Sequence, residues 1–386
     1  MKTIFDIYSM DELETVLEQL INLIKNGISA DLIKKKMKLE MIDELIDIAK
    51  ARIKNNKISE KLFYTTSDLR FATPEIVADY RAKRLKCNAI ADLGCSVGLQ
   101  SFAFAKKCKK VYAIELDEKK IAYAKKNADI LGIKNIEFIH GDILDKKIIE
   151  KLDVDVVFCD PERLPAETER TIETIQPNIK KLMELYSKIT KNICIELPPQ
   201  IKSIPFDCEK EYLSVDGALN RLDVYLGSLK TSEISVVTLP TENIITDRMP
   251  SCDVNKSGAK KFLYEVDAAI TKAGLLKQLL CSLKAPEVFY EGKFTLLTSD
   301  KKEKSPFIRN SYEYINSCID DHLTIIKMLR KYDAGSIQLR GKIDEKQYWR
   351  LKNKIENSIT GKNEFVLFFL ENVVLCKKLR DDRKIN

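Results

Sequence analysis

Apolar and polar positions alternate along residues 89–163 in a pattern typical of strands joined by helices. Four short apolar runs predict strands at Ala89–Ala91, Val111–Ile114, Ile136–Ile139 and Val154–Cys159. Apolar residues at helical spacing predict helices over 99–108 and 118–131. Strands that alternate with helices indicate βαβ units and a parallel sheet. We therefore expect an α/β fold with a Rossmann-like sheet.

The same patterns predict helices before this stretch and a second α/β region after it. An apolar stripe from Leu13 to Ile24 predicts a helix near the N-terminus, and the helical pattern resumes over 37–48. Further strands are predicted at 192–197, 209–214, 222–226, 233–239, 294–297 and 336–339, with a hairpin over 364–370 and 372–377. Further helices are predicted at 177–189, 267–283, 320–331 and 345–357. The domain plan we expect is a helical region at 1–75, the sheet domain at 76–240, a polar linker at 241–261 and a smaller C-terminal α/β domain at 262–386.

Composition narrows the class of protein. The 386 residues are 45% hydrophobic and 32% charged, as in soluble globular proteins. There is no run of 18 apolar residues and no signal-peptide pattern, so we expect no membrane span and a cytoplasmic location. The ten cysteines include no C-x-x-C pair, which favours reduced thiols over disulfides. Because the histidines are only His140 and His322, a zinc site is not expected.

Each predicted strand in the central stretch ends in glycine or an acidic residue. These strand-end segments are Asp92–Gly98, Glu115, Gly141–Asp142 and Asp160–Arg163. Ligands of parallel α/β sheets bind beyond the carboxyl ends of the strands. The sequence therefore predicts a ligand site at this edge of the sheet.

The first strand-end segment, Asp92-Leu93-Gly94-Cys95-Ser96-Val97-Gly98, resembles the D-x-G-x-G-x-G loop of class I methyltransferases that use S-adenosylmethionine. Ser96 stands where that pattern has its middle glycine. A nicotinamide enzyme would usually carry G-x-G-x-x-G instead. S-adenosylmethionine carries a sulfonium cation and no phosphate, so an acidic Asp92 is compatible with it. The resemblance implies a class I methyltransferase fold with S-adenosylmethionine as cofactor.

The resemblance also implies roles for the strand-end residues. Gly94 and Gly98 let the backbone approach the cofactor. Glu115 accepts both ribose hydroxyls, and Asp142 accepts from the adenine amino group. Acids after strands are also common as solvated loop residues or helix N-caps, and helix capping by Thr73 and Pro74 is an equal alternative to a cofactor role. The predicted cofactor residues are Thr73, Pro74, Asp92, Gly94, Cys95, Ser96, Gly98, Glu115, Leu116, Asp142, Ile143 and Asp160.

The predicted catalytic residues are Asp160, Pro161, Glu162 and Arg163. Methyltransferases that modify a base nitrogen often have Asp or Asn, then Pro-Pro and an aromatic, at this loop. An amino nitrogen on a base is a poor nucleophile, and an oxygen that accepts its hydrogens raises its lone-pair density. Asp160 is the expected acceptor, and Arg163 would stack on a base or hold a phosphate. A loop ion pair between Glu162 and Arg163 is the alternative, and Glu196 is a second-rank catalytic candidate.

Two more specific resemblances extend beyond this loop. Residues 71–160 resemble the catalytic domain of the trimethylguanosine synthase family, through Thr73–Ala78, Ala124–Ala128 and Ile136–Asp142. That family has Pro-Pro-Trp where this chain has Asp160-Pro161-Glu162-Arg163. Nearly the whole chain is similar to prokaryotic methyltransferases with a THUMP-like C-terminal domain and an Asp-Pro-x-Arg loop. This second resemblance implies an RNA substrate, because THUMP domains bind RNA.

The charge of the chain agrees with an RNA partner. The net charge is +7, and many cations fall in the C-terminal part, from Lys301 to Arg380. A solvated lysine-rich face accounts for them equally well. Our hypothesis is a methyltransferase that modifies a base nitrogen of tRNA or rRNA, without a metal. The alternatives are methylation of a small molecule or a protein, or an RNA-binding protein that keeps the cofactor fold without catalysis. The sequence does not predict the oligomeric state.

Overall fold

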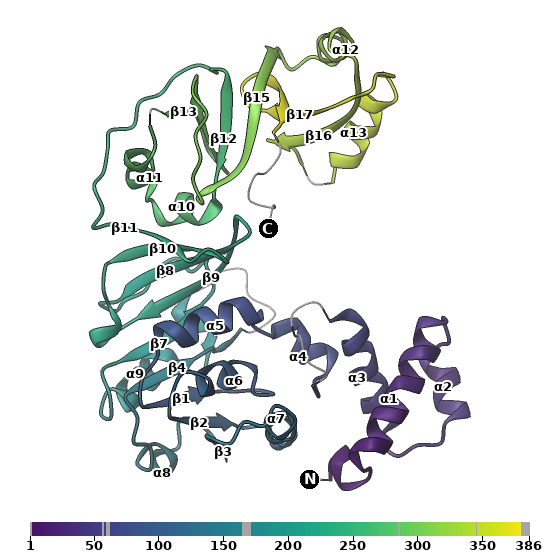
Figure 1. Ribbon diagram of the computed structural model, residues 1–386, viewed down its shortest axis with the longest axis vertical. Coiled ribbons are helices and arrows are strands. Elements are labelled where there is room, and N and C mark those ends of the chain that lie inside the picture. The colour runs from purple at the N-terminus through teal and green to yellow at the C-terminus, as the bar shows by residue number, and fades with distance from the viewer. Residues whose placement is uncertain are drawn as a thin grey trace. The chain divides into compact units, whose positions relative to one another are not determined.

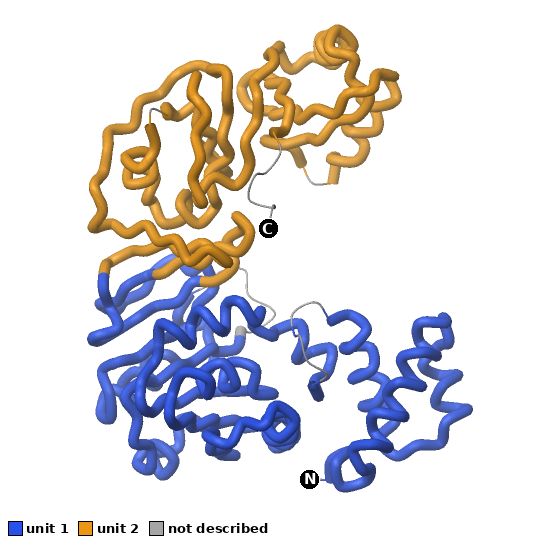
Figure 2. The backbone as a smooth tube through the Cα atoms, in the orientation of Figure 1, with its two compact units in different colours: residues 1–210, 222–231 blue, residues 211–221, 232–386 orange. Residues whose placement is uncertain are grey.

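The computed structural model describes residues 2–55, 58, 62–163, 171–284, 286–344 and 346–379. The chain forms two compact units (Figure 2): unit 1 holds residues 1–210 and 222–231, and unit 2 holds residues 211–221 and 232–386. No helix in the described ranges is both long and apolar enough to cross a membrane. The domain boundaries expected above stay a prediction.

Unit 1 begins with four helices. They are α1 (Met10–Lys25), α2 (Ala30–Lys36), α3 (Ile42–Lys54) and α4 (Thr66–Phe71). The Ser9 and Glu12 side chains form a capping box that starts α1, because each accepts a backbone N–H of the other residue. The helix expected over 37–48 starts only at Ile42, since Met41 takes a left-handed φ of 52° that breaks the helical path.

The rest of unit 1 alternates strands and helices, as the hydrophobic pattern predicted (Figure 1). Its elements up to residue 197 are α5 (Glu75–Arg84), β1 (Ala89–Leu93), α6 (Leu99–Ala105), β2 (Lys110–Glu115), α7 (Glu118–Ile130), β3 (Ile136–His140), α8 (Lys146–Ile149), β4 (Val156–Cys159), β5 (Glu162–Arg163), β6 (Ile175–Gln176), α9 (Ile179–Tyr186) and β7 (Ile193–Leu197). The next strands are β8 (Glu209–Val215) and β9 (Ala218–Tyr225), which are shared between the two units, and β10 (Ile234–Leu239) and β11 (Asn243–Thr246), which belong to unit 2.

The main sheet has the strand order β11-β10-β8-β9-β7-β4-β1-β2-β3. Strands β3, β2, β1, β4 and β7 are parallel to their neighbours, and β9 runs antiparallel to β7. Chain order reverses on the two sides of β1, which makes its carboxyl end the switch point where such sheets bind ligands. The expected Rossmann-like fold class is confirmed.

Two apolar clusters support this sheet. Side chains of α5 and α6 pack on β1, β2 and β4, with Phe104 and Phe158 in edge-to-face contact. The N-terminal helices pack against α7 and the loop before α6, where Phe63 and Tyr123 are buried. The buried Asn127 of α7 donates to the carbonyls of Phe63 and Val97 and accepts from the Phe63 N–H. The N-terminal helices therefore help to fix the loop that follows β1.

Unit 2 is built on a second sheet, in the order β13-β14-β12-β15-β18-β17-β16. Its elements are β12 (Phe262–Val266), α10 (Ala268–Ala273), α11 (Leu276–Ser282), β13 (Glu287–Glu291), β14 (Thr295–Ser299), β15 (Ile308–Cys318), α12 (His322–Lys331), β16 (Ala334–Gly341), α13 (Tyr348–Glu356), β17 (Asn363–Phe369) and β18 (Val373–Lys378). The predicted C-terminal hairpin is confirmed as antiparallel β17 and β18. The helix expected over 267–283 is split in two, because Gly274 takes a left-handed φ of 72°.

Two findings concern the polar segment 241–261. Residues 243–246 form β11, which pairs antiparallel with β10, so this part is a strand. Cys252 forms a disulfide with Cys281 of α11, so the expectation of reduced thiols is wrong for this pair. The Cys252 N–H donates to the Lys277 carbonyl, and this contact seats the segment on α11 and brings the two cysteines together. Their separation of 29 residues forms no sequence motif.

Candidate functional site

The strand ends of unit 1 meet at one edge of the sheet because their registers are aligned. Leu93, the last residue of β1, is level with Ile114 of β2 and with Cys159, the last residue of β4. Glu115 of β2 is level with His140 of β3. The loops that carry the predicted site residues after β1, β2, β3 and β4 therefore begin side by side.

The loop after β1 keeps a tight path in spite of its serine. Gly94, Ser96 and Gly98 take left-handed φ values of 80°, 50° and 93°. A side chain on Gly98 would meet the Phe102 ring at 2.5 Å, whereas the space above the exposed Gly94 is open. Ser96 takes the positive φ that the middle glycine would supply, and its N–H donates to Glu115 Oε2 at 2.9 Å. The open approach to Gly94 is where a ligand can contact the backbone.

Glu115 ties this loop to the start of α7. Its side chain is 9% exposed, and its Oε1 accepts from the Asp117 N–H at 3.0 Å. Each carboxylate oxygen has a second lone pair, so two further donors can be accepted. The next residue, Leu116, is 67% exposed and offers an apolar surface beside this carboxylate.

The loop after β3 presents a second carboxylate. Asp142 is exposed, and its Oδ1 accepts from the Leu144 N–H at 2.8 Å, which orients the side chain. The neighbouring Ile143 is half-buried, and its carbonyl accepts from the Tyr186 hydroxyl of α9 at 2.7 Å. The α9 helix thus anchors this loop at the sheet edge.

Asp92 and Cys95 lie deeper than the other predicted residues. Asp92 is 2% exposed and accepts a hydrogen bond from the Ser101 hydroxyl of α6. Burial raises the pKa of Asp92 to about 6, although Ser101 and the positive charge of Arg81 oppose the rise. Burial also raises the pKa of the Cys95 thiol well above its ordinary value. Asp92 therefore fixes α6 under the loop instead of facing solvent.

Thr73 and Pro74 lie at the start of α5, next to the start of α6. The Gln100 amide in the first turn of α6 donates to the Ala78 carbonyl in the first turn of α5. Pro74 holds the N-cap position and the helix begins at Glu75, so the expectation that the Thr73 side chain caps this helix is wrong. The side chain of the buried Thr73 therefore does not cap α5.

The predicted catalytic residues follow β4, whose four residues are all buried. Asp160 is half-buried and Pro161 is buried. The Glu162 side chain is 85% exposed, and its Oε1 lies 3.8 Å from Lys120 Nζ of α7. The backbone of Glu162 and Arg163 pairs antiparallel with β6, and the Arg163 side chain lies outside the described residues. Asp160 is therefore the member of this group placed directly at the switch point.

Comparisons with known proteins agree with this geometry. A family model described as a methyltransferase domain matches residues 86–215. An uncharacterized S-adenosylmethionine-dependent methyltransferase of Mycobacterium tuberculosis is 25% identical over 232 residues, which cover 58% of this chain and 62% of that protein. Residues 86–215 therefore carry a methyltransferase domain.

Two further comparisons concern the whole chain and a short part of it. The crystal structure of a putative methyltransferase from Porphyromonas gingivalis covers 97% of this chain and 100% of its own, with a TM-score of 0.74 and 16% identity, and so shares the fold. An uncharacterized RNA methyltransferase of Oceanobacillus iheyensis is 40% identical over 81 residues, which cover 20% of this chain and 18% of that protein.

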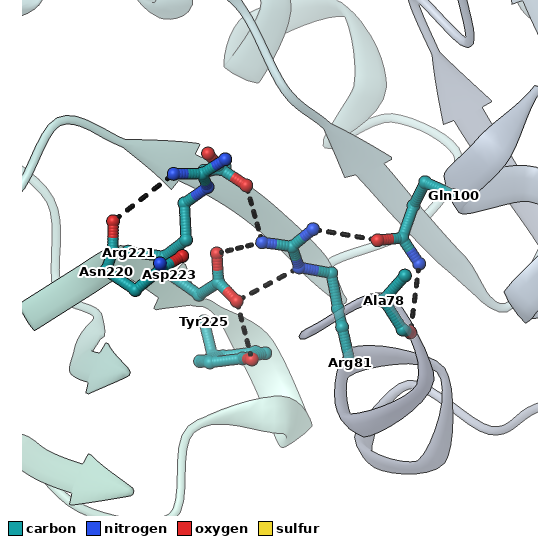
Figure 3. A network of polar contacts seen from close by, with 8 residues as sticks. Ala78, Arg81, Gln100, Asn220, Arg221, Asp223 and Tyr225 are labelled. Carbon is teal, nitrogen blue, oxygen red and sulfur yellow. Dashed lines mark hydrogen bonds and ion pairs between the residues drawn. The ribbon is translucent and has the colours of Figure 1, made fainter. Parts of the chain in front are cut away.

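Unit 1 also contains a buried polar group that sequence reasoning missed (Figure 3). Arg81 of α5 is fully buried and donates to both oxygens of Asp223, at 3.0 and 2.8 Å. It also donates to Glu196 Oε2 at 2.6 Å and to Gln100 Oε1 at 2.8 Å. Its guanidinium lies 4.7 Å from the centre of the Phe158 ring. We call Arg81, Gln100, Glu196 and Asp223 the Arg81 cluster.

The Arg81 cluster assigns a structural task to Glu196, the second-rank catalytic candidate. Burial alone would lower the pKa of Arg81, but Asp223 and Glu196 raise it well above its ordinary value. Arg81 shares a helix face with the buried Val77 and Ala78, so a charged residue at an apolar-periodic position was the signal in the sequence.

No group of three or more His, Cys, Asp or Glu in the described ranges is placed to hold a metal ion. The predicted site residues instead surround the switch point, with hydrogen-bond acceptors at Glu115, Asp142 and Asp160. This arrangement suits a ligand rich in hydroxyl and amino groups.

Proposed function

We propose that this protein transfers the methyl group of S-adenosylmethionine to a base nitrogen of RNA, in tRNA or rRNA. The observation that carries the proposal is the position of Asp160, half-buried at the end of β4 and adjacent in register to the Gly94 loop. The relative from Oceanobacillus iheyensis, named as an RNA methyltransferase, supports the substrate class. The net charge of +7 also suits a polyanionic substrate.

The predicted cofactor residues would each contact a different part of S-adenosylmethionine. The open backbone at Gly94 would hold the amino-acid end, together with Thr73, Pro74, Cys95, Ser96 and Gly98. Glu115 accepts both ribose hydroxyls with its remaining lone pairs. Leu116 and Ile143 would contact the adenine, and Asp142 would accept a hydrogen bond from its amino group. The fit rests on the open space above Gly94 and on the spare acceptor capacity of Glu115.

Asp160 would prepare the target nitrogen for attack. S-adenosylmethionine supplies an electrophilic methyl group on its sulfonium. An amino nitrogen on a base shares its lone pair with the ring, so it attacks slowly. When Asp160 accepts one of its hydrogens, lone-pair density returns to the nitrogen, and the fixed position of the loop aligns the attack. Glu162 and Arg163 follow this acceptor in the chain, on the β5 strand.

We further propose that unit 2 contains a THUMP-like part that presents the RNA, and that the enzyme works in the cytoplasm. The regular second sheet gives this part a core of its own. The metal-free chemistry of the strand-end residues requires no further cofactor.

The test is transfer of a labelled methyl group from the cofactor to total RNA of the source cell, with a protein extract as a parallel acceptor. We expect label in one RNA size class and a loss of about 100-fold or more in rate for Asp160→Ala. The matched control is Asp153→Ala, because Asp153 is an exposed acid in the segment that precedes β4, at the opposite end of that strand from Asp160. Label in protein alone would contradict the RNA substrate, and full activity of Asp160→Ala would contradict the role of Asp160.

A further inference from the structure

A cavity in unit 2 lies apart from the residues discussed so far. It has a volume of about 420 Å³ and is bounded by the ends of β16 and β17, the start of β14 and the first turn of α13. This volume lies in the range of pockets that hold small organic molecules. All its lining residues belong to unit 2.

The walls of the cavity are aromatic. Phe368 is fully buried in the floor, and Phe294 packs on it with the ring centres 6.0 Å apart. At the mouth, Trp349 is 67% exposed and meets the Tyr348 ring edge-on at 5.3 Å. A large aromatic side chain that the fold leaves in solvent is a common feature of binding surfaces. Phe294, Tyr348 and Trp349 are the partly or fully exposed rings of this set, and they offer apolar surfaces to a planar ligand. Lys352 Nζ lies 5.5 Å from the centre of the Trp349 ring.

Two cations line the same cavity. Arg340, at the end of β16, is half-buried, and Lys293 is exposed. Neither side chain has a hydrogen bond or an ion pair to a carboxylate within the described ranges. An arginine held in a wall without a protein acceptor is available to a phosphate, which its planar guanidinium binds through two N–H groups.

A buried carboxylate completes the set. Glu265 of β12 is 5% exposed, and its Oε2 accepts from Asn310 Nδ2 at 2.7 Å and from the Tyr312 hydroxyl at 3.0 Å. Its Oε1 lies 3.7 Å from Arg309 Nη1 and takes no closer donor from the described residues. This oxygen can accept an N–H group from a ligand in the cavity.

We propose that this cavity binds one unpaired nucleotide of single-stranded RNA. The base lies among the aromatic rings at the mouth, its N–H group reaches Glu265, and its phosphate lies on Arg340 and Lys293. Unpaired bases are commonly recognised in RNA by stacking on aromatic rings together with hydrogen bonds to base edges. The inference rests on the proposed function and adds a substrate-holding site away from the methyl-transfer site.

Trp349 makes the proposal directly measurable, because it is the single tryptophan of the chain. The full-length protein is titrated with a mixed-sequence single-stranded RNA hexamer while the tryptophan fluorescence is recorded. We expect saturable quenching as a base stacks on the indole. We expect Arg340→Ala to weaken binding about fivefold and Trp349→Ala, followed with labelled RNA, about tenfold. The control is Lys331→Ala, an exposed cation of α12 outside the cavity, which should bind as the wild type does.

Three results would overturn the proposal. The first is binding of the labelled hexamer with no change in tryptophan fluorescence. The second is wild-type affinity for the hexamer in both Arg340→Ala and Trp349→Ala. The third is binding of free nucleoside monophosphates as tight as that of the hexamer, which would indicate a small-molecule site. The proposed function is scored separately by methyl transfer. If both cavity variants methylate RNA with an unchanged KM for RNA, the cavity proposal is contradicted and the proposed function stands. If the hexamer quenches the tryptophan fluorescence but no RNA is methylated, the proposed function is contradicted and the cavity proposal stands.

Discussion

The strand-end carboxylates Glu115 and Asp142 and the buried carboxylates Glu196 and Asp223 occupy the same unit but are engaged differently. Glu115 and Asp142 accept backbone N–H groups of their own loops and keep lone pairs toward the sheet edge. Glu196 and Asp223 share one guanidinium in the interior, where both are at most 3% exposed. Residue type and position near a strand therefore do not identify a functional acid. Its remaining hydrogen-bond capacity and its access to open space do.

The largest effect is expected when Arg81, the cation shared by Glu196 and Asp223, is removed. Arg81→Leu leaves Glu196 and Asp223 buried without their partner, and we expect a loss of about 3–5 kcal/mol in the free energy of unfolding. Urea unfolding followed by circular dichroism measures it. Lys86→Ala, at an exposed position just after α5, is the control and should stay within about 0.5 kcal/mol of the wild type. A loss below about 1 kcal/mol in Arg81→Leu would mean that the cluster does not hold the fold.

The second prediction concerns Asp92, which is buried like the cluster acids but lies under the ligand loop. Its pKa is raised to about 6 in the folded protein, so its ionisation opposes folding. Its contribution is fully favourable below about pH 4 and is lost as the pH rises through 6. We expect the stability difference between the wild type and Asp92→Asn to shift by about 3 kcal/mol toward the variant between pH 4 and 7. A pH-independent difference would contradict the burial of an ionisable Asp92.

The third prediction tests whether Glu196 stabilises the fold or binds the cofactor. Glu196→Gln keeps the shape but weakens a charged hydrogen bond with Arg81, and we expect a loss of about 1.5–3 kcal/mol in unfolding free energy. Binding of S-adenosylhomocysteine to the folded protein should match the wild type. Weaker cofactor binding without a change in stability would indicate that Glu196 is a cofactor-binding residue and not a structural one.

The smallest effect is expected at Asp142. Its exposed side chain contributes one acceptor, so Asp142→Ala should weaken cofactor binding by about fivefold and leave the melting temperature unchanged. Calorimetric titration with S-adenosylhomocysteine measures the first effect and a thermal scan the second. Asp145→Ala is an unsuitable control because Asp145 caps α8, so the exposed Asp129 on α7 serves instead.

Local hydrophobic patterns predicted many of the strands well, but they did not predict contacts between residues distant in the chain. The strands from β1 to β4 and the β17–β18 hairpin follow from short apolar runs, although β4 pairs with the distant β1. Strand β15 was missed, although it pairs with β12 on one side and β18 on the other. Its bulge between Tyr314 and Asn316 interrupts the polar-apolar alternation that would have identified it.

The same limit applies to the site. Parallel strands bring their carboxyl ends to one edge, so the loops at Gly94, Glu115 and Asp160 could be predicted to lie together. The Arg81 cluster could not, because Arg81 and Asp223 are 142 residues apart and meet only through the packing of α5 on the sheet. The expected Thr73 cap failed for a local reason, since Pro74 itself occupies the N-cap position.

The most direct test of the account is calorimetric titration of S-adenosylhomocysteine into the wild type, Glu115→Gln and Glu196→Gln. Glu115→Gln loses the carboxylate that would accept both ribose hydroxyls, so we predict a 10- to 100-fold higher Kd, while Glu196→Gln keeps the wild-type Kd. Equal Kd values for the wild type and Glu115→Gln would contradict the claim that the strand-end carboxylates hold the cofactor.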